Sequence, residues 1–185
     1  KILPLVDLLL AKANCRLTDL DVIGFGQGPG SFTGVRISVA IAQGLAYACK
    51  LPLVGVSTLQ MMAQQAYQQT GEKSVFSAID ARMGEIYFAH YRLSDNGVMT
   101  LQGDEQVLKP ALLSLADEPG IAVGTGWQTY PEALADNPQI AINNDIILPD
   151  AGFMLATISD DFSAQRTVSA AQAQPKYVRD TVTWK

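Results

Sequence analysis

The sequence predicts an α/β protein with two lobes that are related by an internal duplication. The expected elements of residues 73–185 run β-β-β-α-β-α-β-α, and those of residues 1–72 run α-β-α-β-α, the same series without its three opening strands. In each half a Gly-x-Gly turn, at 28–30 or at 124–126, comes after the strand that follows the first helix. The length of 185 residues fits two small lobes.

The first predicted element is a helix over residues 2–13 with a wide apolar side. At about 100° per residue, its apolar positions cover an arc of roughly 160°, whereas contact with one core needs a stripe of roughly 100°. These positions are Ile2, Leu3, Leu5, Val6, Leu9, Leu10 and Ala13. We therefore expect this helix to bury two faces.

A strand over residues 21–27 and a helix over 33–49 follow. The glycine turn ends the strand, and Ser31 or Thr33 is the expected N-cap of the helix. This helix carries a ridge of small residues beside a bulky ridge, which allows another helix to approach closely. The small ridge is Ala40, Gly44 and Ala48, and the bulky ridge is Ile37, Ile41 and Leu45.

The first lobe closes with a strand over 53–56 and a helix that runs from its Ser57 cap to Gln69, and residues 70–73 mark the lobe boundary. Two strands alone do not form a stable sheet, and three helices cannot cover one. We therefore expect the natural protein to have a β-meander before Lys1.

The second lobe opens with a β-meander and continues with alternating helices and strands. The meander consists of strands over 75–81, 86–93 and 98–102, the last continuing to Leu108, with a turn at 94–97. Downstream we expect a helix that begins with Pro110, a strand over 121–123, a short helix near 130–135, a strand over 139–142, a helix from the Asp150 cap to Phe162, and an extended segment in the tail, residues 175–185.

Composition excludes several classes of protein. The chain is 48% hydrophobic and 17% charged, which is typical of globular proteins rather than of disordered or fibrous ones. Its net charge of −5 argues against holding a nucleic-acid backbone by bulk attraction. Cys15, Cys49 and His90 are too few for a disulfide framework, a four-thiolate zinc site or a multi-histidine metal site. No apolar run reaches the roughly 18 residues of a membrane span, and no signal peptide is evident, so we expect a cytoplasmic protein.

The glycine loop that starts the helix over 33–49 is the strongest local feature. Backbone N–H groups at a helix start bind anions, and glycines let a phosphate approach. However, no Gly-Lys-Ser/Thr follows, and the next strand ends without the acidic residue of a dinucleotide site. We predict a structural turn, with phosphate binding and a protein contact as the weaker alternatives. The candidate phosphate-loop residues are Gly28, Gly30, Ser31, Thr33 and Gly34.

Two further positions could carry chemistry. Asp80 ends the first strand of the second lobe, with Arg82 and Glu85 nearby, and such carboxylates could hold a hydrated Mg²⁺. A structural Asp–Arg pair at a turn is the favoured reading. His90 alternates with other residues in a strand, and the Gly-x-Ser-x-Gly elbow of a hydrolase triad is missing. We therefore expect His90 to be a surface residue or a satisfied one, that is, one whose ring is hydrogen-bonded to its neighbours.

Several segments resemble the bacterial TsaB (YeaZ) family, in the family's order and over the whole chain. They are Gly28-Pro29-Gly30-Ser31-Phe32-Thr33-Gly34-Val35-Arg36, Gln43-Gly44-Leu45-Ala46, Val56-Ser57-Thr58-Leu59, Ile79-Asp80-Ala81-Arg82-Met83-Gly84-Glu85-Ile86-Tyr87, Val123-Gly124-Thr125-Gly126-Trp127 and Pro175-Lys176-Tyr177-Val178-Arg179. The resemblance implies a two-lobed actin/Hsp70/sugar-kinase-like (ASKHA) fold.

The resemblance also implies a function. The family supplies the accessory subunit for threonylcarbamoyladenosine synthesis at position 37 of ANN-decoding tRNAs, so tRNA is served indirectly. It pairs with TsaD, the catalytic paralogue once labelled a glycoprotease, and the ATPase TsaE joins that complex. TsaD binds its metal through a His-x-x-x-His helix motif, and the equivalent helix over 2–13 has no histidine. The resemblance therefore implies a catalytically silent subunit without a metal or cofactor. The meander that is missing here carries an acidic residue and a phosphate loop in this superfamily, so no nucleotide site in the first lobe is implied.

The alternative from another class is a sugar-kinase-like ATPase or phosphotransferase, with Asp80 as the candidate carboxylate in an interlobe cleft. A metallopeptidase is disfavoured because the chain has a single histidine. For the accessory subunit, the two apolar helices are the expected contact with the paralogue, in a pseudo-symmetric four-helix interface. The same surface could form a homodimer when the partner is absent. The apolar candidates are Ile2, Leu5, Leu9, Ile37, Ile41 and Leu45.

Overall fold

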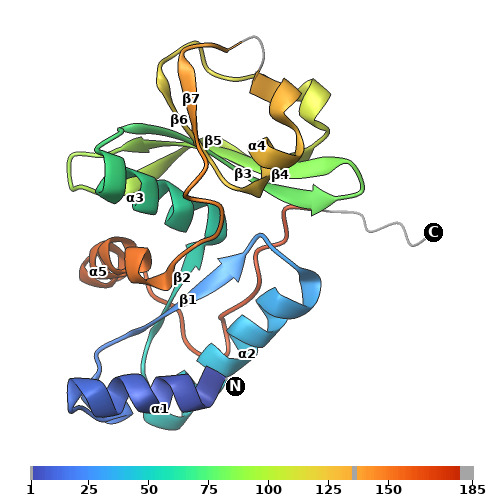
Figure 1. The fold of residues 1–185 in the computed structure, drawn as a ribbon. Helices are drawn as coiled ribbons and strands as arrows, with labels where there is room; N and C mark the ends of the chain where they lie inside the picture. Colours follow the sequence, from blue (N-terminus) through green and yellow to red (C-terminus); the bar gives the residue numbers. More distant parts are fainter. Residues whose placement is uncertain (1, 135–136, 180–185) are drawn as a thin grey trace.

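The computed structural model describes residues 2–134 and 137–179, and it contains two separate β-sheets. One sheet has two strands in the order β1-β2, and the other has five in the order β5-β4-β3-β6-β7. Figure 1 shows the sheets one above the other, with helices on their faces. The two-lobed α/β architecture predicted from the sequence is therefore confirmed.

The first lobe is built on a small parallel sheet. Its elements are α1 (Ile2–Ala13), the 3₁₀ turn Leu17–Asp19, β1 (Ile23–Gly28), α2 (Phe32–Cys49) and β2 (Leu53–Ser57). Strands β1 and β2 pair in parallel from Ile23 opposite Leu53. Ser31 caps α2 by accepting a hydrogen bond from Gly34 N at 3.2 Å, so of the two predicted caps it is Ser31 that has this role.

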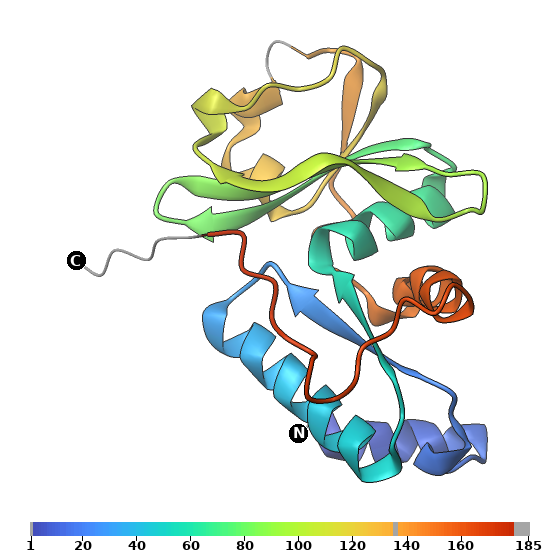
Figure 2. The same cartoon turned by 180° about the vertical axis from the view of Figure 1, so that it is seen from behind.

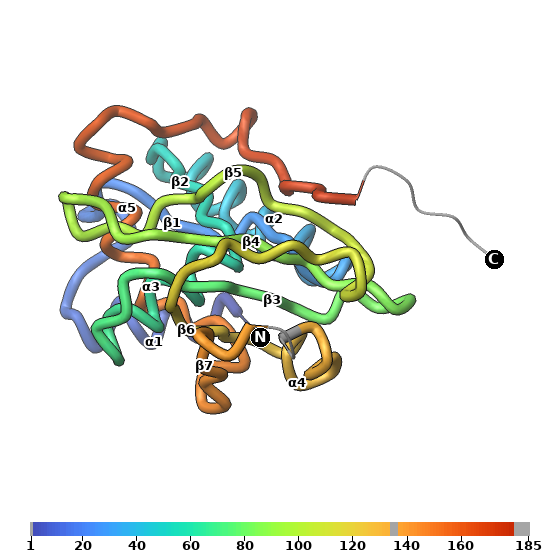
Figure 3. Tube along the Cα trace, turned by 90° about the horizontal axis from the view of Figure 1, so that it is seen from above, coloured from blue at the N-terminus to red at the C-terminus, as the bar shows by residue number. Residues whose placement is uncertain are grey.

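The second lobe begins with the predicted meander. Helix α3 (Thr58–Thr70) leads into β3 (Ser74–Arg82), β4 (Glu85–Leu93) and β5 (Met99–Leu108). These strands pair in antiparallel fashion, whereas β6 (Gly120–Val123) and β7 (Ile140–Asn143) extend the sheet in parallel on the other side of β3. Figure 3, seen from above, shows the five strands lying side by side in this order.

Three short elements differ from the prediction. The helix expected from Pro110 is wrong: only a 3₁₀ turn, Pro110–Leu112, forms there, because the chain is already extended at Leu113 and packs Leu113 and Leu115 against one core cluster. Residues after Gly124 form a helix, α4 (Thr125–Thr129), and the helix expected near 130–135 is the 3₁₀ turn Pro131–Leu134. The helix capped by Asp150 begins as the 3₁₀ turn Ala151–Met154 and continues as α5 (Leu155–Ser163).

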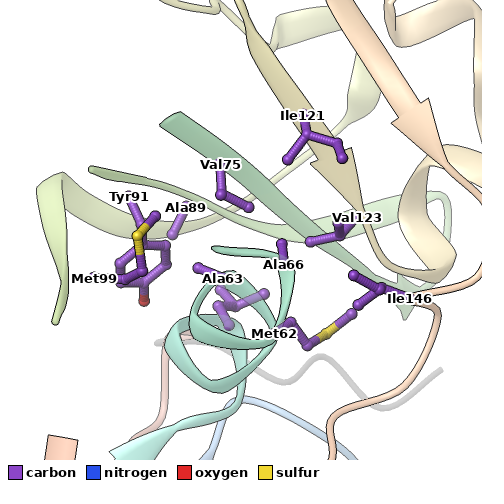
Figure 4. Packing of buried hydrophobic residues seen from close by; sticks show 11 residues of the cluster. Met62, Ala63, Ala66, Val75, Ala89, Tyr91, Met99, Ile121, Val123 and Ile146 are labelled. Atoms are coloured by element: carbon purple, nitrogen blue, oxygen red, sulfur yellow. The ribbon is translucent and has the colours of Figure 1, made fainter. Parts of the chain in front are cut away.

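The two lobes exchange helices across the predicted boundary. Helix α3 packs on the five-stranded sheet, where Met62, Ala63 and Ala66 contact buried residues of β3 to β6 (Figure 4). Helix α5 packs on the two-stranded sheet, where Ile158 and Met154 lie against Val54. The division at residues 72 and 73 remains a prediction, but each lobe in this arrangement is completed by a helix from the other half of the sequence.

The segment after α5 also returns to the first lobe. Val168 pairs with Leu53 at the free edge of β2 through two 2.9 Å backbone hydrogen bonds. Ala173 is buried in the same cluster as Phe25 and Val39. The extended segment predicted for the tail is described as far as Arg179, where it forms no ladder of strand pairs, and the rest of that prediction lies outside the described residues.

Candidate partner surface and interlobe cleft

Helices α1 and α2 present an exposed apolar face. Leu5 is 58% exposed and Leu9 is 65% exposed, and Ile2 and Ile37 are exposed as well. Ile41 and Leu45 are half-buried. Of the six side chains predicted for a partner interface, four are therefore exposed and two are half-buried.

The expectation that α1 buries two faces is not met by the chain alone. No residue of α1 is buried, and Val6 and Leu10 are only half-buried. The reason is that α2 already occupies the adjacent face of the small sheet, where Val39, Ala42 and Ala46 are buried. Little sheet surface is left for α1, so most of its apolar residues remain exposed.

A cleft of about 1150 Å³ lies between the lobes. Gly30 and Ser31 of the first glycine turn line one side, and Asp80, Arg82 and Thr125 line the other. The fold thus brings both Gly-x-Gly turns and the end of β3 to one place. Of the other phosphate-loop candidates, Gly28 is buried, and Thr33 and Gly34 lie on the exposed first turn of α2, outside the described lining of the cleft.

The first glycine loop forms the predicted strand-to-helix turn. Gly28 has φ +104°, and a Cβ there would lie 3.1 Å from the carbonyl oxygen of Lys176, so the position suits glycine. Val35 N donates to Ser31 O at 3.0 Å and continues the helix. The hydrogen bonds within the loop therefore stabilise the turn and the first turn of α2.

Asp80 closes the turn between β3 and β4. Its Oδ1 accepts a hydrogen bond from Arg82 N at 3.0 Å, and its Oδ2 lies 3.5 Å from the Arg82 guanidinium. Asp80 N also lies 3.2 Å from Thr125 Oγ1, to which it donates. The favoured prediction, an Asp–Arg pair at a turn, is confirmed. In residues 2–134 and 137–179 no three His, Cys, Asp or Glu side chains are grouped to hold a metal ion.

His90 belongs to a polar cluster on the second sheet. Its Nε2 lies 2.9 Å from Ser74 Oγ and 2.9 Å from Glu118 Oε1, and its ring stacks on Phe76 with the centroids 4.4 Å apart. Burial and the neighbouring Arg92 charge lower the pKa of His90. A hydrolase triad needs the acid and the nucleophile on opposite ring nitrogens, but here both meet Nε2. His90 is therefore a satisfied residue, as predicted.

Arg36 has a set of contacts that the sequence did not reveal. Its guanidinium carbon lies 3.5 Å from the centre of the Phe32 ring, and its Nε donates to the Tyr177 hydroxyl at 2.9 Å. Phe32 is one helical turn away, a spacing that could have been noticed. Tyr177 is close to the other end of the chain, and no local pattern indicates that contact.

This two-lobed fold, with its duplicated strand–glycine–helix turns, defines an ASKHA-like protein of the TsaD class. The family model described as "TsaD: tRNA N6-adenosine threonylcarbamoyltransferase" matches residues 1–174. The chain belongs to the TsaB (YeaZ) family. It is 42% identical to the tRNA threonylcarbamoyladenosine biosynthesis protein TsaB of Escherichia coli K12, over 100% of this chain and 82% of that protein. The TsaB protein of Haemophilus influenzae is 39% identical, over 100% of this chain and 81% of that protein.

Solved structures agree with this assignment. The structure of YeaZ from Pseudomonas aeruginosa matches with a TM-score of 0.89 and 39% identity, covering 96% of this chain and 82% of that one. A second Pseudomonas aeruginosa structure, described as an uncharacterized protein with similarity to peptidase YEAZ, has a TM-score of 0.88 and 40% identity, with the same coverage.

Proposed function

We propose that this protein is a non-catalytic subunit of the machinery that forms threonylcarbamoyladenosine at position 37 of ANN-decoding tRNAs. In this role it docks on and supports a TsaD-type catalytic paralogue, in a complex that a TsaE-type ATPase joins, and it contacts tRNA at most indirectly. The names of its relatives support the pathway. The observation that carries the subunit role is the uncovered apolar face of α1 and α2.

The number of large aliphatic side chains exposed on α1 and α2 favours a protein contact. Covering one large aliphatic side chain contributes roughly 1.5–3 kcal/mol, and contiguous exposed apolar surface of this kind marks interaction sites. Two neighbouring helices, one with a small-residue ridge, are suited to pack against an equivalent pair on a paralogue. In the absence of the paralogue, the same patch can pair with its own copy about a two-fold axis.

A membrane is the other apolar environment to consider. Helix α2, Phe32–Cys49, is long and apolar enough to cross a bilayer when length and composition alone are counted. However, Val39, Ala42 and Ala46 are buried against the small sheet. In addition, the Gln43 amide donates to Ala173 O at 2.9 Å. These contacts belong to a helix packed in a folded lobe, and they support a partner protein and a cytoplasmic location.

Catalytic silence is part of the proposal. The polar groups at the cleft and at His90 are engaged with one another: Asp80 with Arg82, Glu85 with Arg179, and His90 with Glu118. The alternative, an ATPase or phosphotransferase, rests on the position of Asp80 in the cleft. ATP hydrolysis by the isolated chain that is abolished in Asp80→Asn would support that alternative.

The test uses charge substitutions on the exposed face. In Leu5→Glu and Ile37→Glu, we expect the affinity for the TsaD-type partner to fall roughly 30-fold or more, since loss of a central apolar anchor costs about 2 kcal/mol. Leu155→Glu is the matched control, because Leu155 is 68% exposed but lies on α5. Binding is measured by calorimetry and function by tRNA modification with and without the chain. Folded variants that bind as tightly as the control would refute the surface.

A further inference from the structure

The last described residues cross from one lobe to the other. After α5 the chain runs along the first lobe and then rises to the second beside β1 and α2 (Figure 2). We call residues 173–179 the strap. Four of them, from Lys176 to Arg179, line the interlobe cleft.

The strap is bound to the first lobe by both backbone and side chains. Ala173 is buried there, and its carbonyl accepts the Gln43 amide at 2.9 Å. Lys176 N donates to Gln27 O, at the end of β1, at 2.8 Å. The Tyr177 hydroxyl accepts from Arg36 Nε on α2 at 2.9 Å.

The same short segment is bound to the second lobe by two ion pairs. Lys176 Nζ lies 3.2 Å from Glu105 Oε2, and the Glu105 side chain is only 2% exposed. The other Glu105 oxygen accepts the Tyr91 hydroxyl at 2.7 Å. Arg179 pairs with Glu85 and donates to Ala81 O at 3.3 Å.

The Lys176–Glu105 pair matters most for the position of the strap. It is an ion pair by distance and not a hydrogen bond, since the buried Glu105 Oε2 has no hydrogen-bond partner in the part of the chain that the structure describes. A buried carboxylate that loses its cation is strongly destabilised, so it must regain either a partner or water. Water reaches Glu105 when the strap and the lobe separate. The need of the buried Glu105 carboxylate for a cation therefore couples the position of the strap to that of the second lobe.

Elsewhere the lobes meet through α3, whose Met61 packs with Val54 and Val56 of β2, and on the α5 side. The chain passes between them at Ser57–Thr58 and again over residues 144–150. The Asn96 amide donates to Asp160 Oδ1 of α5 at 2.7 Å. In Figure 1, α5 lies at one side of the molecule, and the strap rises at the other. On the side where the cleft lies, the strap therefore connects the two lobes.

We propose that the strap is a latch that fixes the angle between the lobes and holds the interlobe cleft closed. When the latch is released, the lobes open about the connections at Ser57–Thr58 and 144–150. Hinged closure of this kind depends on a few contacts that differ between the open and closed forms. Here these contacts are Lys176 with Glu105, Arg179 with Glu85, and Tyr177 with Arg36.

The experiment measures the distance across the cleft in the full chain. Cys15 and Cys49 are replaced by serine, and spin labels are attached at Thr33→Cys on α2 and Gln128→Cys on α4, both exposed positions. Pulsed electron spin resonance then gives the distribution of distances between the labels. We expect one narrow distribution with the intact strap, and in Lys176→Met a mean distance longer by more than the width of that distribution.

Three further variants complete the experiment: a control, a rescue of Lys176→Met and a second test of the strap. Lys12→Met removes an exposed lysine from α1, which is outside the strap, and leaves the distance unchanged. Adding Glu105→Gln to Lys176→Met removes the unpaired buried charge and shifts the distance back toward its original value. Tyr177→Ala changes a half-exposed side chain and tests the Arg36 contact in a chain that folds. The latch is refuted if folded Lys176→Met and Tyr177→Ala both keep the distribution of the intact strap.

Discussion

Gly124 offers a quantitative test of the packing between α4 and the five-stranded sheet. It has φ +107°, and an added Cβ would lie 2.1 Å from Ala78 O and 3.0 Å from Met62 Cε. Its N–H donates to Ile146 O at 2.8 Å, so the backbone is held from the other side. Gly124→Ala therefore forces either β3 or the start of α4 to move.

The expected cost combines two effects. A non-glycine residue in the backbone conformation of Gly124, φ +107° with ψ 168°, costs about 1–3 kcal/mol, and forcing an extra methyl into a packed region costs about 1–3 kcal/mol. We expect Gly124→Ala to lower the free energy of unfolding by about 3 kcal/mol. For a chain of this length that corresponds to a fall in Tm of about 6–12 °C.

Gly71→Ala is the matched control for this substitution. Gly71 also has a positive φ, +81°, but nothing lies within 4 Å of an added Cβ. Its cost should be about 1 kcal/mol, from the backbone alone. Urea unfolding followed by circular dichroism gives both values at a common m-value. If Gly124→Ala is no more destabilising than Gly71→Ala, the steric argument is wrong.

Two further predictions concern ionisation and metal content. Burial and then the Glu105 charge raise the pKa of Tyr91 well above its ordinary value of 10.0, so the stability that this phenol contributes is present below about pH 10 and is lost as the pH rises further. Tyr91→Phe should be less stable than the parent by about 1–3 kcal/mol at neutral pH, because a buried Glu105 oxygen loses its donor, and urea midpoints measured above about pH 10 should show this gap narrowing. Elemental analysis of protein purified without chelator should find no stoichiometric zinc or iron, and a one-to-one metal content would contradict the catalytic silence proposed here.

The sequence predicted the parts of the fold that depend on local pattern. Apolar periodicity and turn residues located the major helices and strands, and the Ser57 cap of α3 is confirmed by the hydrogen bond that its Oγ accepts from Leu59 N. The helix expected from Pro110 is wrong because a proline start is only a local signal, whereas packing against the core holds Leu113 and Leu115 in a segment that is extended at Leu113.

Long-range contacts could not be predicted in this way. Periodicity showed that α1 has more apolar surface than one contact requires, but not that the chain leaves every residue of α1 exposed or only half-buried. Likewise, Lys176 and Tyr177 belonged to a recognisable motif, but their partners Glu105 and Arg36 are distant in sequence. Such contacts follow from the path of the whole chain, which no short window of sequence contains.

The exchange of helices between the lobes determines the order in which this chain can fold during synthesis. The five-stranded sheet draws on neighbouring segments, with α3 leading directly into β3, β4 and β5. The two-stranded sheet is made first by the ribosome. One of its faces carries Met61 and is completed only when Met154 and Ile158 arrive, and the other carries α2 and is completed only when Ala173 arrives. Contacts of high sequence separation form slowly, and unfinished cores expose aggregation-prone surface. The core of the half that is translated first is therefore completed last, and until then part of its apolar surface stays exposed to other chains.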